Sequence, residues 1–218
     1  MPEFPMVHRH LLLGALTTAL ALGTAACKPP EPQGSARGPA LFQTCASCHG
    51  ADGGGRQEYG APAIAGLPEW YVKAQLEKFR SGARGAHADD VAGLRMRPMA
   101  RQLASEADVG IVAAHVASLP KTTPAATVTG DVGHGRELFG TCAACHGQGA
   151  QGNQGLSAPP LNRASDWYLV TQLGHFKSGI RGTNAADTTG AQMRPMALGL
   201  ADERAMRDVV AFIGTLPD

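Results

Sequence analysis

Two short stretches of the chain carry the residue types best suited to chemistry. In each stretch two cysteines stand three positions apart and a histidine follows the second one; these residues are Cys45, Cys48 and His49, and then Cys142, Cys145 and His146. Two thiols at this spacing can form thioether bonds to the vinyl groups of one haem, and the adjacent histidine can then bind the iron. The motifs therefore predict two covalently bound c-type haems, with His49 and His146 as iron ligands.

Other uses of paired cysteines fit these motifs less well. A structural zinc ion needs four ligands, whereas each motif supplies two cysteines and one histidine. A disulfide or a thioredoxin-like redox pair would account for the cysteines, but it would not explain why a histidine follows them in both copies. The pattern favours haem attachment over these alternatives.

The second axial ligand of the iron decides between electron transfer and catalysis. None of the histidines outside the motifs and the amino-terminal region recurs in the second copy, but two methionines do, because Met96 corresponds to Met193 and Met99 to Met196. A thioether favours reduced iron and, opposite a histidine, leaves no open coordination position. Each pair is predicted to contain the ligand, on a long loop, and spacing alone does not choose between its two members.

Arginine and tryptophan also recur at equivalent positions, as Arg84 with Arg181 and Trp70 with Trp167. A guanidinium group or an indole N–H can hold the carboxylates of haem propionates. The alternative is a tryptophan in the core and an arginine on the solvated surface. Glycines flank both arginines, which favours the propionate role for them.

All these residues belong to a tandem duplication with a period of 97 residues. About 37 of the 83 positions from Gly38 to Pro120 are identical in the second copy, with no gap. The prediction is a first unit over 38–120, a linker over 121–133 and a second unit over 134–218. Units of this size bury a modest core, so a bound prosthetic group could supply much of the missing interior.

The periodicity of apolar residues indicates which helices surround the cysteine motifs. Apolar residues recur at three- and four-residue spacing over 69–82 and over 105–120, and the copies repeat this pattern. Ser105 lies three residues before Asp108, which indicates a helix start. Short helices are expected to lead into each cysteine motif, and no segment alternates as a strand would. The predicted fold is all-α, with a few short helices wrapped around a covalent haem in each unit.

The amino-terminal region has the pattern of an export signal. A weakly basic start precedes the apolar run Leu11–Gly23 and a small-residue end, which predicts a signal peptide over 1–26. An uncleaved membrane helix is the alternative, but the run is shorter than the roughly 20 residues that span a bilayer. Cys27 follows a sequence similar to a bacterial lipoprotein processing site, so we expect its acylation rather than a free thiol. The stretch 27–37 is rich in proline and predicts an extended tether.

With these motifs in place, the chain resembles the class I c-type cytochromes, and specifically their dihaem, two-domain periplasmic group, the c-four type. The segments CASCHG, EWYVKAQLEKFRSG and MRPMA, with their copies, are similar to that family over roughly residues 38–217. In that family the first methionine of a Met-x-x-Met pair binds the iron, which the resemblance carries to Met96 and Met193. Single units also resemble cytochrome domains fused to some haem–copper oxidase subunits.

The resemblance implies an electron-transfer protein and not an enzyme. We expect a carrier on the periplasmic side of a bacterial membrane, anchored through Cys27, that takes electrons from a quinol-oxidising complex (cytochrome bc-type or an alternative) and passes them to a haem–copper oxidase. The alternative is a cytochrome subunit of a larger dehydrogenase or oxidase; a dihaem peroxidase fits less well because it needs a vacant or displaceable iron ligand. The net charge of +1 shows no electrostatic footprint for nucleic acid.

Overall fold

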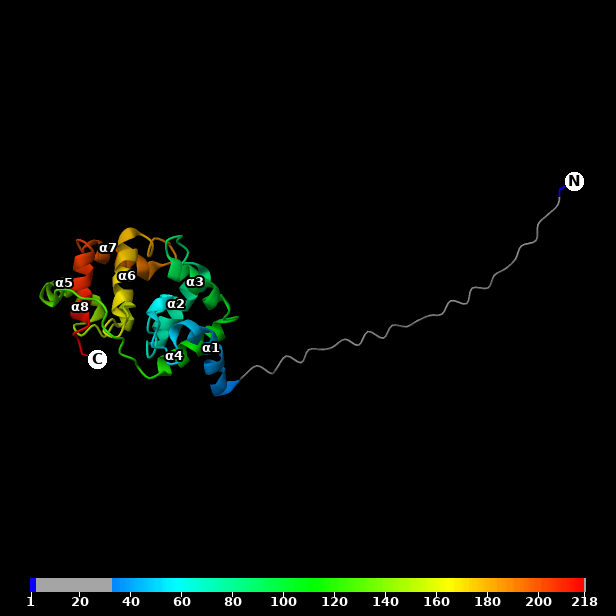
Figure 1. The fold of residues 1–218 in the computed structure, drawn as a ribbon, viewed down its shortest axis with the longest axis horizontal. Helices are drawn as coiled ribbons and strands as arrows, with labels where there is room; N and C mark the ends of the chain where they lie inside the picture. The colour runs from blue at the N-terminus through cyan, green and yellow to red at the C-terminus, as the bar shows by residue number, and fades with distance from the viewer. Residues whose placement is uncertain (3–32, 218) are drawn as a thin grey trace. The chain divides into compact units, whose positions relative to one another are not determined.

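A computed structural model describes residues 1, 2 and 33–217. The residues from 33 onward form one folded unit in which every regular element is a helix, and the only β features among them are two isolated bridges, Arg56 with Ala61 and Asn153 with Ala158 (Figure 1). The predicted all-α fold is confirmed. The expected signal peptide, Cys27 and most of the tether lie outside the described residues. No described helix is long and apolar enough to cross a membrane.

The first repeat contains α1 (Arg37–His49), α2 (Glu69–Ser81), α3 (Val91–Arg101) and α4 (Glu106–Ser118). Helices α1 and α2 both pack on α4, and α3 packs on α2. Apolar side chains at helical spacing close a small core between these helices. The buried members of that core include Phe42, Leu76, Phe79, Leu103, Val109, Val112 and Val116.

The second repeat contains α5 (Val132–His146), α6 (Asp166–Ser178), α7 (Thr188–Leu198) and α8 (Glu203–Ile213). Helices α5 and α6 pack on α8, and α7 packs on α6, so the arrangement of the first repeat recurs. Its core includes Phe139, Met206, Val209, Val210, Phe212 and Ile213. Each repeat is therefore a small helical unit with its own apolar interior.

The segments that carry the methionines are helices, where the sequence analysis predicted loops. The side chain of Asp90 accepts a hydrogen bond from the backbone N–H of Gly93 at 2.9 Å, and that of Asp187 accepts one from Gly190 at 3.0 Å, so both carboxylates cap a helix start. Pro98 lies inside α3, after several helical bonds have formed. The loop prediction was wrong because the repeated Asp-x-x-Gly cap outweighs the helix-breaking effect of glycine and proline.

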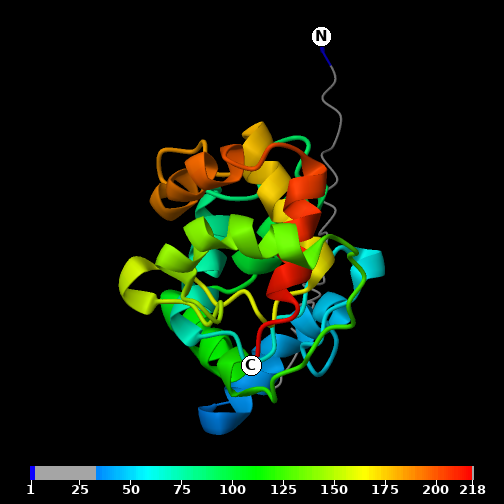
Figure 2. The same cartoon turned by 90° about the vertical axis from the view of Figure 1, so that its left-hand side faces the viewer.

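The linker between the repeats follows the outside of the folded unit and reaches α5 (Figure 2). Asp166, at the start of α6, accepts hydrogen bonds from the backbone N–H of Thr127 at 2.5 Å and of Val128 at 2.7 Å. Burial acts to raise the pKa of Asp166, but these bonds outweigh it and hold the pKa below its usual value. The carboxylate thus fixes the course of the linker over the second repeat.

Candidate haem sites

Each cysteine motif occupies the last turns of a helix, because α1 ends at His49 and α5 ends at His146. The next residue is Gly50 in one repeat and Gly147 in the other, with φ of 83° and 82°. Glycine adopts this left-handed backbone without steric cost, so the helix stops there. Both histidines are buried at the stop, with 8% and 5% of their surface exposed.

The two histidines have equivalent hydrogen-bond partners in the two repeats. Nδ1 of His49 lies 2.8 Å from the carbonyl oxygen of Pro62, and Nδ1 of His146 lies 2.8 Å from that of Pro159. A carbonyl only accepts, so Nδ1 carries the proton and Nε2 keeps its lone pair. Burial lowers the pKa of both histidines, which favours the neutral ring. Metal-ligating histidines commonly have this arrangement, with one nitrogen fixed and the other free to bind.

The motif cysteines form no disulfide with one another. Cys45 is half-buried against the first core, and burial raises the pKa of its thiol to about 11. Burial likewise raises the pKa of Cys142, which packs against the second core. Thiols three residues apart on a helix lie on one face, so Cys48 can reach the same bound group as Cys45, and Cys145 the same group as Cys142.

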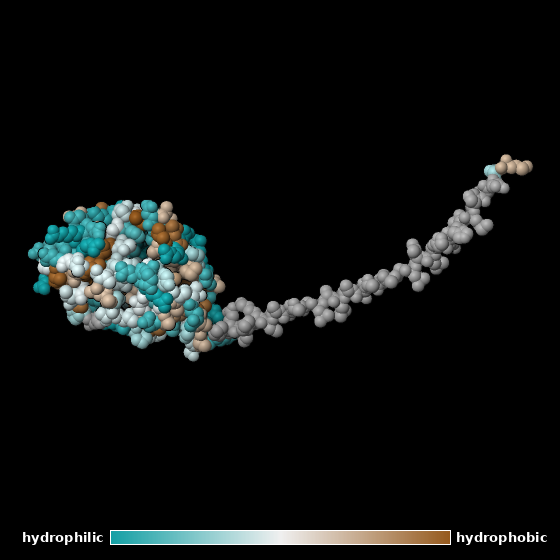
Figure 3. All heavy atoms as spheres, viewed as in Figure 1, coloured by the Kyte–Doolittle hydropathy of each residue, from teal (hydrophilic) through white to brown (hydrophobic). Residues whose placement is uncertain are grey.

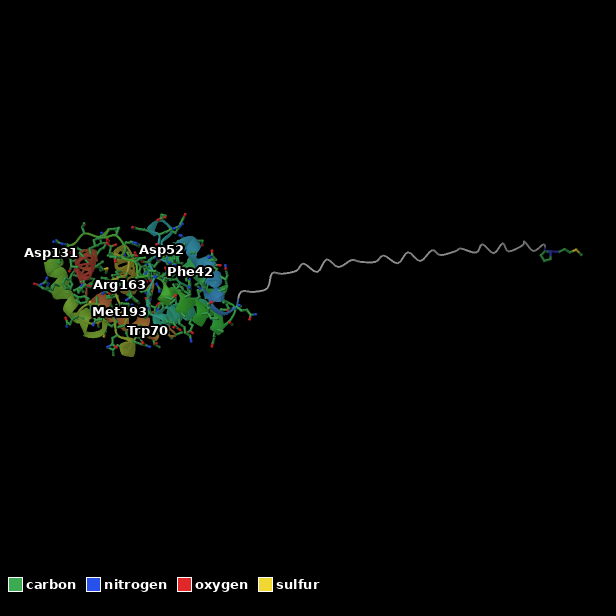
Figure 4. All side chains as sticks on the ribbon, turned by 90° about the horizontal axis from the view of Figure 1, so that it is seen from below. Phe42, Asp52, Trp70, Asp131, Arg163 and Met193 are labelled. Carbon is green, nitrogen blue, oxygen red and sulfur yellow. The ribbon has the colours of Figure 1, made fainter. Side chains whose placement is uncertain are left out.

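The methionines differ in burial. Met96 of α3 is half-buried and packs against the first core, and Met193 of α7 is half-buried as well. Met99 is half-buried, whereas 42% of Met196 is exposed, so the protein itself does not bury that side chain. Figure 4 shows Met193 between Asp131 at one end of the folded unit and the first repeat at the other.

Arg84 and Arg181 meet between the two repeats and share two glutamine oxygens. Arg84 donates from Nη1 to Oε1 of Gln75 at 2.8 Å and from Nη2 to Oε1 of Gln172 at 3.0 Å. Arg181 donates from Nη1 to Gln172 at 2.7 Å and from Nη2 to Gln75 at 3.1 Å. These four side chains, the arginine–glutamine ring, have an approximate twofold symmetry that relates the repeats.

Both arginines are buried, at 7% and 9% exposure, so a position on a solvated surface is wrong for Arg84 and Arg181. Their Nε atoms have no hydrogen-bond partner in the described part of the chain. Guanidinium groups stay charged in proteins, although burial and the charge of Arg84 lower the pKa of Arg181. Two buried cations bonded to neutral amides, with spare donors, fit an anion such as a haem propionate. The residues present thus fit the haem group.

The ion pairs between the repeats do not follow that symmetry. Nζ of Lys78 lies 2.5 Å from Oδ1 of Asp187, which is fully buried. His175 and Asp90 occupy the equivalent positions, but Nδ1 of His175 is 3.8 Å from the carboxylate and makes no hydrogen bond. The interface therefore combines a symmetric ring with one ion pair and one looser contact.

Trp70 and Trp167 are half-buried, and each packs edge-on against the tyrosine that follows it. No hydrogen bond from either indole N–H occurs within the described ranges. Trp167 lines a cavity of about 600 Å³ together with linker and α8 residues that include Thr127 and Met206. A contact of these tryptophans with haem remains a prediction.

The signals that sequence reasoning missed are the glutamines and the caps. Gln75 and Gln172 recur at the repeat spacing, as do Asp90 and Asp187, but spacing alone does not reveal a bond across an interface. A polar residue repeated on an otherwise apolar helix face is the signal that could have identified the glutamines.

Comparison with known proteins gives one consistent result. The profile of the cytochrome c family matches residues 35–120 and again 132–217. The thiosulfate dehydrogenase electron acceptor of Stutzerimonas stutzeri is 34% identical over 176 residues, which is 76% of either chain. The protein of that name from Thiomonas intermedia is 34% identical over 201 residues, 87% of this chain and 82% of its own. Reduced recombinant cytochrome c4 from Pseudomonas stutzeri has a TM-score of 0.67 at 27% identity, over 85% of this chain and 100% of that one.

Proposed function

The chain belongs to the cytochrome c family, with two cytochrome c domains in tandem, and from that premise we propose that it carries one covalent haem c in each domain and transfers single electrons. The two domains are the two repeats described above. The observation that carries the proposal is the duplicated histidine, which in both domains is buried and holds its Nε2 free because Nδ1 donates to a proline carbonyl at 2.8 Å.

In the first domain Cys45 and Cys48 would form the thioether bonds to the haem, and His49 and Met96 would bind its iron. The residues of the second domain with the same roles are Cys142, Cys145, His146 and Met193. The haem, when bound, supplies an Fe(II)/Fe(III) couple for one electron. With a histidine and a methionine both bound to the iron, these side chains would exclude water and small ligands from it, which disfavours catalysis at the iron.

Arg84 and Arg181 are proposed to hold propionates from the two domains. Their orphaned Nε donors and their buried positive charges support this role. Since both arginines belong to one ring between the domains, the two haem sites share a single polar boundary. That arrangement suits an electron exchanged inside one molecule before it leaves for a partner.

The cellular setting is proposed from the sequence. The export signal, Cys27 and the proline-rich stretch support a lipid-anchored protein on the periplasmic side of a bacterial membrane. A quinol-oxidising complex is the proposed donor and a haem–copper oxidase the proposed acceptor. Replacing Cys27 with serine tests the anchor: the variant should leave the membrane fraction, and a variant that stays there would contradict acylation.

A second candidate is the electron acceptor of a substrate-oxidising dehydrogenase. Two relatives at 34% identity carry that role in their names, which supports it. The test mixes oxidised holoprotein with a thiosulfate dehydrogenase and thiosulfate, and follows the haem spectrum. Rapid reduction that needs both enzyme and thiosulfate would favour this candidate; reduction only by a quinol-oxidising complex would favour the first.

The test of the haem chemistry uses the purified holoprotein. A pyridine haemochrome assay with intact mass should give two covalent haems per chain, and both should be low-spin and titrate at positive potential. One haem per chain, a haem extracted by acid acetone, or rapid carbon monoxide binding to either ferrous haem would contradict the proposal.

A further inference from the structure

Helices α3 and α7 carry the same methionine pair, but their surfaces differ in charge. Three arginines lie on α3, whereas the equivalent residues on α7 are a glutamine, an arginine and a leucine; the pairs are Arg95 with Gln192, Arg97 with Arg194, and Arg101 with Leu198. Neither helix contains an aspartate or glutamate between its end residues. The proposed iron-ligand helix therefore presents three positive charges in the first domain and one in the second.

The arginines of α3 are not neutralised within the described part of the chain. Arg95 and Arg101 are exposed and Arg97 is half-buried. Arg95 donates to the carbonyl oxygen of Tyr59 at 2.9 Å, and Arg101 donates to that of Arg80 at 3.1 Å. These bonds orient two of the guanidinium groups, but a carbonyl carries no charge that could offset them.

Apolar surface lies among these charges. Leu94 is 39% exposed and Pro98 is exposed. These two side chains and the arginine stems line a shallow hollow of about 460 Å³; its lining is Leu94, Arg97, Pro98, Arg101 and Gln102. Figure 3 shows brown, hydrophobic spheres set among teal ones where α3 lies in Figure 1. We call Leu94, Arg95, Arg97, Pro98 and Arg101 the α3 face. An apolar centre with arginines around it is a common composition of docking surfaces.

Acidic residues lie in the sequence beyond both ends of α3. Asp89 precedes α3 and lies 3.7 Å from His87, and Glu58 adjoins Tyr59 near Arg95. At the other end the exposed Glu106 begins α4 five residues after Arg101, and Arg80, whose carbonyl oxygen accepts the hydrogen bond from Arg101, adds a further cation there. Arg97 and Arg101 line the hollow itself, whereas none of its lining residues is acidic, so positive charge lies directly beside the apolar surface.

We propose that the α3 face is the docking site for an acidic surface on a protein redox partner. This proposal rests on the electron-transfer function proposed above. Opposite charge steers such a partner to the first domain and raises the association rate. Met96 belongs to the same helix, so a partner on this face lies within about one helix diameter, ~10 Å, of the proposed ligand. The equivalent surface of α7 has one arginine and an exposed Leu198, and it attracts acidic partners less.

The test measures electron transfer from the reduced holoprotein to an acidic plastocyanin by stopped flow, at low and high ionic strength. The variant carries Arg95→Gln with Arg101→Leu, the residues at the equivalent positions of α7, and the matched control carries Gln192→Glu with Leu198→Glu on α7, so that each pair of substitutions lowers the net charge by two. The second-order rate constant at low salt should fall about tenfold or more in the first variant and less than about twofold in the control. Added salt should slow the wild type and leave the first variant nearly unchanged.

Two further measurements separate the possible outcomes. The rate of haem reduction by the uncharged duroquinol should be equal in the wild type and both variants. A wild type whose haems are not reduced and reoxidised even with this reagent would overturn the electron-transfer function itself. Equal rate losses in both variants, no loss in either, or faster reaction with a lysine-rich cytochrome c than with plastocyanin would overturn the docking site alone. If the α3 variant no longer binds vesicles of equimolar phosphatidylglycerol and phosphatidylcholine but keeps the wild-type rate of electron transfer to plastocyanin, the α3 face binds a lipid surface and the proposal is contradicted.

Discussion

The two domains hold their first and last helices together with different residues. In the first domain, Nε of Arg37 donates to Oδ1 of Asp108 at 3.0 Å. In the second, His134 takes the place of Arg37, and its Nδ1 lies 2.8 Å from Oδ2 of Asp208. Asp208 stands about one turn beyond Ala205, the residue that aligns with Asp108, so the partner has moved along the helix.

This difference separates what the haem site requires from what the fold requires. The motif cysteines, the motif histidines and the paired methionines are the same in both domains, as the proposed haem sites require, since each of these residues would have to meet one group with fixed geometry. The contact between the first and last helix of a domain only has to pair a buried carboxylate with a cation. A carboxylate at the position of Asp108, or one turn further along the helix at Asp208, achieves this equally. An arginine stays charged at all ordinary pH values, whereas a histidine does not.

The largest expected effect tests whether the two iron sites are equivalent. Met96→Ala and Met193→Ala should each remove about half of the sulfur-to-iron charge-transfer absorbance, because each domain would lose its axial thioether. The affected haem should fall in potential and bind carbon monoxide when ferrous. Absorption spectra and potentiometric titration check this. A full band in either variant would show that another residue is the ligand in that domain.

The next effect tests the asymmetry of the interface. Lys78→Met leaves the buried Asp187 without its cation, so the free energy of unfolding should fall by about 3–5 kcal/mol. His175→Met should change it by less than about 1 kcal/mol, because Nδ1 of His175 has no hydrogen bond to lose. Denaturant unfolding of the holoprotein measures both. Equal losses would mean that His175 pairs with Asp90 as firmly as Lys78 pairs with Asp187.

A smaller effect concerns pH. The hydrogen bond to Asp208 raises the pKa of His134, and the hydrogen bond from His134 lowers the pKa of Asp208. Because the pKa of His134 is higher in the folded than in the unfolded protein, protonated His134 stabilises the folded state. This stabilisation is complete below about pH 6.5, the pKa of an unfolded histidine, and it disappears as the pH rises through the pKa of His134 in the folded protein. Because the pKa of Asp208 is lower in the folded protein, ionised Asp208 stabilises the folded state above about pH 4, and this stabilisation is lost in acid. The His134 contact should therefore be strongest between about pH 4 and 6.5.

The first domain provides the control for this pH dependence. The hydrogen bond from Arg37 lowers the pKa of Asp108, so that contact also weakens in acid but not on the alkaline side. Thermal unfolding between pH 6 and 8 should show a stability loss that His134→Arg removes. If the loss persists in this variant, another group is responsible for it.

The smallest expected effect concerns the second methionine of each pair. Met196 is 42% exposed, so Met196→Ala should change stability by no more than about 0.5 kcal/mol. Met99 is half-buried, and Met99→Ala should cost about 1–2 kcal/mol, less than for a fully buried methionine. Both variants should keep the charge-transfer band. If Met99→Ala removes the band while Met96→Ala keeps it, the ligand is three residues further along.

The helices that lead into the motifs and close each domain could be predicted from the sequence, because apolar spacing and a capping serine such as Ser105 are local signals. The helical state of α3 and α7 was missed. Their glycines and internal prolines argue locally for a loop, and the decisive Asp90 and Asp187 caps are single short side-chain contacts. Here local statistics pointed one way and a specific hydrogen bond the other.

The sequence by itself determined the attachment motifs, the duplication and the candidate methionines, because these depend on residue type and spacing along one chain. Only the tertiary structure decided that Arg84 and Arg181 share Gln75 and Gln172 between the domains. It also decided that Asp208, and not the aligned residue Ala205, takes the role that Asp108 has in the first domain. These contacts join residues roughly 70 to 106 positions apart. The arginine–glutamine contacts depend on how the two domains pack against each other, and the contact of His134 with Asp208 depends on how α5 packs on α8; spacing along the chain carries no information about either.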